Sequence, residues 1–350
     1  MKAALILAGL LAIFWALTLW KAARHEARAR ASHPPLGGFV TVGRARLHLL
    51  QAGAGPDIVL IHGASGNMRD FTHDLMGRLT DRYRVTVLDR PGLGHSDRLD
   101  RDGASIFEQA DCLIDALGQI GVTQALVLGH SYGGAVALAM ATRHPKHVAG
   151  LILLAAASNP WTTPLSRYYR VLSHPVGQWL AAPLLTAWVP DRVVTDAIAQ
   201  IFAPQPIPPG YAQHIGAGLS LQRRALRENA LQRAALLPEI VQMLPDYASL
   251  DLPVEILHGD QDTTVGLAIH SEPLARQIRG ATLCVMTGVG HAPHHADPTR
   301  VVAAIERASD RARLRQGASG HNVKACNIPC RAAGHISARA IGRVIGHEDT

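Results

Sequence analysis

Short apolar runs alternate with helical stretches along most of this chain, and this alternation constrains its fold more than any other feature. Runs rich in Val, Ile and Leu predict strands at residues 39–51, 57–61, 84–88, 124–128, 148–155, 253–258 and 281–287, and helical stretches lie at 105–120, 132–144, 266–278 and 298–308. Strands that are apolar throughout and alternate with helices indicate a mostly parallel sheet flanked by helices. We therefore expect an α/β fold.

One long segment interrupts this alternation. Residues 158–250 are rich in Leu and Ala, are punctuated by Pro, and contain no strand-like run. They are predicted to form a helical cap inserted into a core that comprises residues 39–157 and 251–310. Residues 311–350 have no sustained periodicity and are predicted to be a disordered tail.

The amino-terminal region contains an uncharged stretch of 18 residues, 3–20. This length approaches the ~20 residues that span a bilayer core and exceeds the ~7 to 15 of a signal-peptide apolar region. Residues 1–30 are therefore predicted to be a transmembrane anchor with a basic flank, followed by a Pro- and Gly-rich linker at 31–38. Trp15 and Trp20 suit an interfacial aromatic belt, and the basic flank after Trp20 favours a cytoplasmic catalytic domain.

Two other interpretations of this segment stay open. Cleavage of a signal peptide at Ala27-Arg28-Ala29 or at Ala29-Arg30-Ala31 would export the rest of the chain. A buried core helix is the third interpretation, and it is disfavoured because a core helix does not need such charged flanks.

The charge distribution argues against a nucleic-acid partner. The formal net charge is +7, but residues 1–30 carry +4 and residues 311–350 carry +5, which leaves −2 for the rest. A nucleic-acid interface is expected on a folded basic face, and this chain places its positive charge in two terminal segments.

The four cysteines do not predict a disulfide framework. Cys112 and Cys284 lie in apolar runs and are expected to be buried, whereas Cys326 and Cys330 lie in the polar tail. Together with His321 and His335, the tail cysteines have a spacing that zinc sites tolerate. We favour an unstructured tail, and no metal or organic cofactor is predicted.

A candidate nucleophile lies at the junction of a predicted strand and a predicted helix. The sequence Gly129-His130-Ser131-Tyr132-Gly133 has the pattern G-x-S-x-G in the strand-to-helix context that a nucleophile elbow requires. Small residues on either side of the serine let the strand and the helix pass close together. A simple turn would explain a lone motif of this kind equally well, so other motifs must decide.

Three further motifs, in the order found in one known family, support the elbow. They are Ile61-His62-Gly63-Ala64, the segment 89–97 (DRPGLGHSD), and Gly288-Val289-Gly290-His291. With the elbow, they make residues 39–308 resemble the α/β-hydrolase superfamily, most closely its lid-bearing esterase, haloperoxidase-like and carbon-carbon bond hydrolase branches. The resemblance implies the eight-stranded, mostly parallel sheet of this superfamily, and it implies the fold more firmly than the substrate.

The resemblance also implies a catalytic triad. A serine hydroxyl needs a base, and His291 in the loop after the last strand matches the family's catalytic histidine. His294 and His295 are competitors that are expected to begin the final helix or to line the site entrance. In the segment 258–265 (HGDQDTTV), Asp262 matches the acid that orients the base, and Asp260 is expected to support the turn. The order Ser131, Asp262, His291 is that of the fold.

The remaining predictions for the site concern the oxyanion and the histidines beside it. Backbone N–H groups of Ala64 and Tyr132 are expected to stabilise the oxyanion of the tetrahedral intermediate. His62 and His130 are interpreted as structural. Because haloalkane dehalogenases and epoxide hydrolases of this fold use an aspartate as nucleophile, Ser131 disfavours those reactions.

The aromatic residues of the predicted cap bear on the substrate. Three of the five tryptophans, Trp161, Trp179 and Trp188, lie there with Tyr168 and Tyr169. They either form a pocket for an apolar ester or pack the cap onto the core. Three functions remain: an ester hydrolase, an enzyme that uses the same triad for peracid or carbon-carbon bond chemistry, and a catalytically silent binding protein. The expected partners are a small-molecule ester and a lipid bilayer, and the oligomeric state is unknown.

Overall fold

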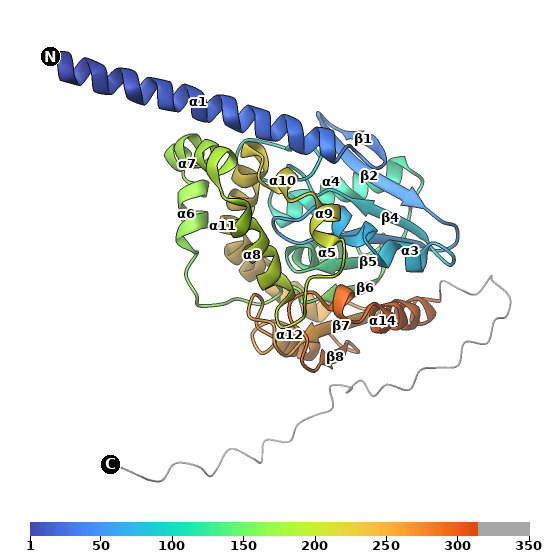
Figure 1. Cartoon of the computed structure of the whole chain (residues 1–350). Coiled ribbons are helices and arrows are strands. Elements are labelled where there is room, and N and C mark those ends of the chain that lie inside the picture. The colour runs from blue at the N-terminus through green and yellow to red at the C-terminus, as the bar shows by residue number, and fades with distance from the viewer. Residues whose placement is uncertain (314–350) are drawn as a thin grey trace, which may run out of the picture.

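The structure, a computed structural model, describes residues 1–313 and contains the expected eight-stranded, mostly parallel sheet (Figure 1). The strands are β1 (Gly38–Val42), β2 (Ala45–Ala52), β3 (Asp57–Ile61), β4 (Arg84–Leu88), β5 (Ala125–His130), β6 (Val148–Leu154), β7 (Val254–Gly259) and β8 (Thr282–Met286). Their order in the sheet is β1-β2-β4-β3-β5-β6-β7-β8. The candidate tail metal site falls beyond residue 313, outside the described residues.

The first apolar run forms two strands because Gly43, with φ of +59°, allows a tight turn between β1 and β2. These strands pair antiparallel with each other, and β2 pairs antiparallel with β4. All later pairs are parallel, so the carboxyl ends of β3 to β8 lie along one edge of the sheet. Loops at that edge carry every motif expected to be catalytic.

Helices cover both faces of the sheet. The core helices are α2 (Arg69–Thr72), α3 (Leu75–Leu79), α4 (Ile106–Gln119), α5 (Tyr132–Arg143), α12 (Ser271–Gln277), α13 (Pro293–Ala296) and α14 (Pro298–Arg311). Residues of α4, α5 and α12 share one buried apolar cluster, and residues of α3 and α14 share the cluster on the opposite face. Helix α4 begins with a capping box in which Ser105 and Glu108 each bind the other's backbone N–H. Cys112 and Cys284 are buried, as expected.

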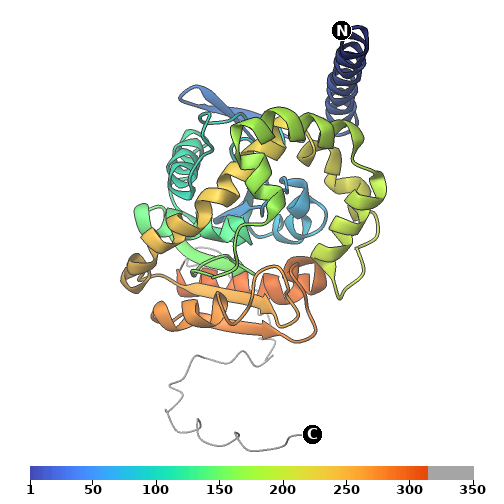
Figure 2. The same cartoon turned by 90° about the vertical axis from the view of Figure 1, so that its left-hand side faces the viewer.

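The insertion between β6 and β7 is helical, as predicted. It consists of α6 (Arg167–Ser173), α7 (Pro175–Trp188), α8 (Asp191–Phe202), α9 (Tyr211–Ile215), α10 (Ala217–Ser220), α11 (Arg223–Met243) and the 3-10 helix η1 (Leu244–Ser249). Figure 2 shows these helices arranged around the carboxyl edge of the sheet. The cap therefore lies over the candidate site.

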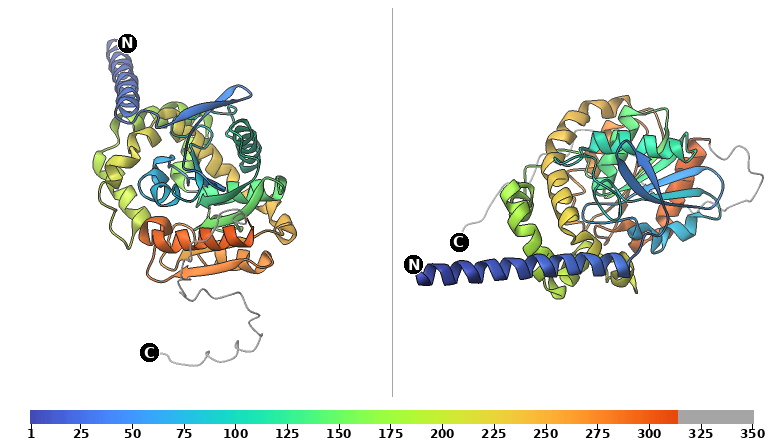
Figure 3. Two further views of the ribbon diagram at one scale, coloured as in Figure 1. Left: turned by 90° about the vertical axis from the view of Figure 1, so that its right-hand side faces the viewer. Right: turned by 90° about the horizontal axis from the view of Figure 1, so that it is seen from above.

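The amino-terminal segment is one long helix, α1 (Lys2–Ser32), which is long and apolar enough to cross a membrane. Only 6% of its most apolar 18-residue window is buried, so it is not a buried core helix. Its second half packs along the cap, where Glu26 forms an ion pair with Arg223 (2.8 Å) and Arg30 donates to Gln222 (2.9 Å). Its amino-terminal end extends beyond the rest of the molecule (Figure 3).

Candidate active site

Ser131 occupies a strained turn between β5 and α5. Its φ of +54° and ψ of −117° lie in a region that residues other than glycine rarely adopt. The flanking glycines make this turn possible, because a Cβ at Gly129 would collide with the carbonyl of Gly133 and a Cβ at Gly133 with the carbonyl of Ile61. The turn presents the serine at the carboxyl edge of the sheet.

His291 and Asp262 come from two different motifs, lie 29 residues apart in the chain, and are hydrogen-bonded. Nδ1 of His291 lies 2.7 Å from Oδ2 of Asp262, and both side chains are buried. Burial alone would raise the pKa of Asp262, but hydrogen bonds from His258, His291 and the backbone hold this pKa well below its ordinary value. The aspartate is therefore ionised and can keep His291 in the tautomer that carries its proton on Nδ1.

His258 is a second partner of Asp262 that the motifs did not predict. Its Nε2 donates to the carbonyl of Val265 (2.7 Å) and lies 3.1 Å from Oδ2 of Asp262, while its Nδ1 accepts from Ser271 (2.6 Å). The other oxygen of Asp262 accepts from the backbone N–H groups of Thr264 and Val265. His258 begins the quoted motif 258–265, but its role depends on contacts that the motif alone does not reveal.

Ser131 and His291 line the same cavity, as a serine and its base must. Within residues 1–313 the Ser131 hydroxyl forms no hydrogen bond, so the serine and the imidazole share the cavity without a bond between them. Such bonds are commonly long or absent in hydrolases without substrate and form with substrate present.

The two backbone N–H groups expected to form an oxyanion site belong to residues that line this cavity. Tyr132 is the first residue of α5, where a helical N–H has no partner within the helix, and Ala64 lies in the loop after β3; both residues line the cavity. Arg90 holds this loop, because its guanidinium donates to the carbonyls of His62 and Gly63 and stacks on the Tyr132 ring. Burial lowers the pKa of Arg90 to about 10, so it stays charged at neutral pH.

The cap also contacts this loop. Asn229 of α11 accepts from the backbone N–H of Ser65 and donates to the Ser65 hydroxyl, and both hydrogen bonds are 2.8 Å long. Ser65 itself has a positive φ of 55°. The conformation of the predicted oxyanion loop thus depends on a cap helix that lies 164 residues further along the chain.

The competing histidines belong to a separate cluster around Asp70, which the sequence motifs also did not reveal. Asp70 accepts from His294 (3.2 Å), His295 (2.9 Å) and the Tyr211 hydroxyl (2.8 Å). His130 donates from Nε2 to the His291 carbonyl, which leaves its Nδ1 3.7 Å from Asp70. The histidines of α13 therefore bind a carboxylate rather than Ser131.

This cluster has the composition of a metal site. The ligand atoms of Asp70, His294 and His295 lie within 4.8 Å of one another. The hydrogen bonds to Asp70 satisfy both carboxylate oxygens, so the cluster holds together as a hydrogen-bond network. His62, also interpreted as structural, donates from Nδ1 to the Gly63 carbonyl and accepts at Nε2 from the backbone of Arg90.

The cavity above Ser131 has a volume of about 1080 Å³ and a largely apolar lining from both core and cap. Trp161, Tyr168 and Tyr169 line it, as one of the two interpretations of the cap aromatics required. Trp179 and Trp188 neither line the cavity nor pack the cap onto the sheet. They contact α1 instead. The reason is that α7 lies between the cavity and the amino-terminal helix.

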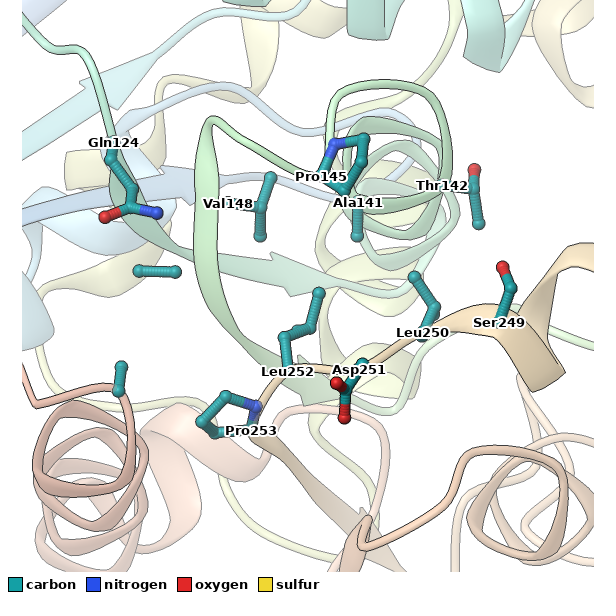
Figure 4. Close-up of a pocket in the computed structure, with 12 residues that line it drawn as sticks. Gln124, Ala141, Thr142, Pro145, Val148, Ser249, Leu250, Asp251, Leu252 and Pro253 are labelled. Carbon is teal, nitrogen blue, oxygen red and sulfur yellow. The ribbon is translucent and has the colours of Figure 1, made fainter.

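A smaller cavity of about 340 Å³ lies at the opposite end of the sheet (Figure 4). Gln124, Val148 and Pro253, at or just before the amino ends of β5, β6 and β7, contribute to its lining. Ligands of open α/β sheets bind at the carboxyl ends of the strands. The larger cavity is therefore the candidate active site.

The comparisons with known proteins agree with this architecture. The chain is 28% identical to 2-hydroxymuconate semialdehyde hydrolase from a Pseudomonas strain, over 75% of this chain and 90% of the relative. Its fold resembles a solved esterase of Thermogutta terrifontis (TM-score 0.65, 23% identity, 79% of this chain and 99% of that one). It also resembles a bacterial membrane phospholipase A (TM-score 0.62, 21% identity, 89% and 97%).

A family model provides the assignment. The model of the alpha/beta hydrolase family matches residues 58–305, which is well over half of the chain and includes all the motifs described above. The chain belongs to the alpha/beta hydrolase family.

Proposed function

We propose that this protein is a serine hydrolase that cleaves a carboxylic ester with a largely apolar acyl or alcohol group. The observation that carries the proposal is that Ser131, on its strained turn, shares a cavity with a histidine hydrogen-bonded to a buried, ionised aspartate. An ester fits the apolar lining and the two backbone N–H donors better than a charged substrate does.

In the proposed reaction His291 takes the proton of the Ser131 hydroxyl as the oxygen attacks the ester carbonyl. The oxyanion forms beside the N–H groups of Ala64 and Tyr132. When the carbon-oxygen bond of the ester breaks, His291 returns its proton to the leaving alcohol, and the acyl group stays on Ser131. Water, deprotonated by His291, then releases the acid and restores the serine. Asp262 stabilises the imidazolium formed in both steps.

Labelling by a fluorophosphonate probe tests the proposal. The full chain is expected to react at Ser131, Ser131→Ala to lose labelling, and His291→Ala to label far more slowly. His147→Ala is a matched control, because this exposed histidine binds the Thr123 carbonyl at the opposite end of the sheet. Absence of labelling in the unsubstituted protein would favour the catalytically silent binding protein.

Carbon-carbon bond hydrolysis is the second candidate, because the Pseudomonas relative is named as a hydrolase of a semialdehyde. A panel of short and long p-nitrophenyl esters, a dienoic meta-cleavage compound, and peroxide with acetate separates the candidates. Turnover of the esters alone supports the proposal, whereas preferential loss of the dienoic compound would replace it with the second candidate.

The amino-terminal helix is proposed to be a retained membrane anchor, with the catalytic domain on the cytoplasmic side. Both candidate cleavage sites lie in the part of α1 that packs against the cap through Glu26 and Arg30. Cleavage there would divide a docked helix, which argues against a removed signal peptide. Protease protection in closed vesicles tests the orientation.

A further inference from the structure

Two helices of the cap expose several large apolar side chains. We call this surface the cap face, and its residues, all in α6 and α7, are Tyr168, Val171, Val176, Trp179, Leu180 and Trp188. Val176, Trp179 and Leu180 follow the spacing i, i+3, i+4 and so lie on one side of α7. Trp179 is 62% exposed. A group of exposed apolar side chains on one side of a helix marks a candidate interaction site.

The cap face is continuous with the amino-terminal helix. Helix α7 packs along α1, and the Trp179 ring lies 5.6 Å from the Trp15 ring. Trp188 stacks on Phe14, donates from its indole nitrogen to the Thr18 hydroxyl (3.0 Å), and carries the Lys21 ammonium over its face. Figure 3 shows the amino-terminal end of α1 continuing past the cap. Whatever surrounds the part of α1 that carries Phe14 and Trp15 therefore also meets the cap face.

The contact between the Trp15 and Trp179 rings shows how far the cap face lies from the end of the apolar run of α1. The run ends at Trp20, and Trp15 lies five residues before this end, which corresponds to about 7.5 Å along the helix axis. If α1 crosses a bilayer whose apolar interior ends at Trp20, Trp179 lies at a similar depth below that edge of the interior. Amphipathic helices at membrane surfaces bury their apolar side by about 5 to 10 Å. The positions of Lys21 and Arg24, just outside the run, agree with this boundary.

The catalytic cavity reaches the same part of the cap. A shallow, almost wholly apolar groove of about 430 Å³ lies between α6 and α7. Val171 of the cap face lines the groove, while Tyr168 and Leu185 line both the groove and the cavity that contains Ser131. Figure 2 views the molecule from the side towards which α1 projects. In this view the cap helices are arranged around the sheet domain. The two spaces are thus neighbours across Tyr168 and Leu185.

We propose that the cap face lies in the surface of the bilayer that α1 crosses, and that the substrate is a long-chain acyl ester drawn from that bilayer past Tyr168 and Leu185. The substrate part of this inference rests on the proposed function. The bilayer contact does not rest on the proposed hydrolysis, but it does rest on the proposed membrane anchor, together with the apolar surface, its continuity with α1 and its depth.

A fluorescent label tests the bilayer contact. Val176→Cys is labelled with an environment-sensitive NBD group in a full chain that also carries Cys326→Ser and Cys330→Ser, because Cys112 and Cys284 are buried. Val285→Cys, on edge strand β8, is the control, since Val285 is also an exposed valine (41%). In phosphatidylcholine vesicles with spin-labelled lipids, the label at 176 is expected to be quenched and the label at 285 is not. Equal quenching, or a disulfide that joins two unlabelled copies through the cysteine introduced at position 176, would overturn the contact.

Activity on two kinds of ester tests the substrate. Neither Val176 nor Leu180 lines the cavity, so the double variant Val176→Ser, Leu180→Ser is expected to hydrolyse soluble p-nitrophenyl butyrate at the unchanged rate. Its hydrolysis of a long-chain ester embedded in the same vesicles is expected to fall roughly tenfold, as two apolar side chains no longer enter the lipid. Val285→Ser should leave both rates unchanged.

The outcomes separate the two proposals. Equal rates of the double variant and the unsubstituted chain on the embedded ester would overturn the route from the bilayer. If the unsubstituted protein cleaves neither ester and Ser131 does not label, the proposed function fails, and the quenching experiment still decides whether the cap face contacts lipid.

Discussion

Individual carboxylates with similar sequence surroundings have very different environments in this protein. Asp262 is buried and bound to two histidines, whereas Asp260, two residues earlier, is exposed and accepts from the backbone N–H of Gly288. The family motif was enough to predict which of the two lies beside His291. It could not predict His258 or Asp70, because their partners come from loops that only the folded sheet brings together.

Asp262→Asn tests this difference at the level of one atom. The amide can donate to Nδ1 of His291 and so favour the wrong tautomer, and kcat for the ester is expected to fall by about 10³- to 10⁴-fold with little change in KM. Asp260→Asn keeps its acceptor for Gly288, so its rate should stay within about twofold. Steady-state kinetics on p-nitrophenyl butyrate measure both, and similar losses in the two variants would contradict the assignment of the acid.

At the scale of elements, the close passage of β3, β5 and α5 determines where Ser131 lies. The strand and helix preferences of the sequence were enough to predict the strands, with β1 and β2 as one run, and the helical insertion. The packing of α7 against α1 was not predictable, because Trp179 and Trp188 have the same apolar character whether they face a pocket, a core or another helix.

Two glycine substitutions test the close passage. Gly133→Ala places a methyl group against the carbonyl of Ile61, and the loss of stability is expected to exceed about 3 kcal/mol, which would show as little folded protein. Gly118→Ala in α4 meets no atom within 4 Å and is expected to stabilise by about 0.5 to 1 kcal/mol. Thermal unfolding in detergent micelles measures both changes. A Gly133→Ala protein that is as stable as the unsubstituted chain would mean that the three elements are not tightly packed.

The molecule as a whole carries an unusual number of buried neutral histidines. Burial lowers the pKa of His62 and of His270 to about 4, and burial also lowers the pKa of His130 and His294. An unfolded chain binds a proton at each such residue near pH 6.5, whereas the folded chain does so only at much lower pH. Their contribution to stability is therefore complete above pH 6.5 and is lost as the pH falls, and for His62 and His270 this loss takes place between pH 6.5 and about pH 4.

His270→Gln isolates one of these contributions. His270 accepts from the backbone N–H groups of Ser158 and Asn159, and the glutamine oxygen offers an acceptor that does not titrate. The unsubstituted protein is expected to lose on the order of 2 kcal/mol at His270 between pH 7.5 and pH 5. The melting temperature of the variant should consequently fall less over this interval, and parallel decreases in the two proteins would argue against the burial of a neutral His270.

The docking of α1 on the cap affects how this protein can be handled. Removal of residues 1–32, a common way to make an anchored protein water-soluble, would take away the partners of Arg223, Gln222 and Trp188. The shortened chain would present a bare tryptophan-rich flank to water beside helices that line the cavity over Ser131. Low turnover or aggregation of such a shortened chain would then reflect the missing helix and not a low activity of the full-length protein.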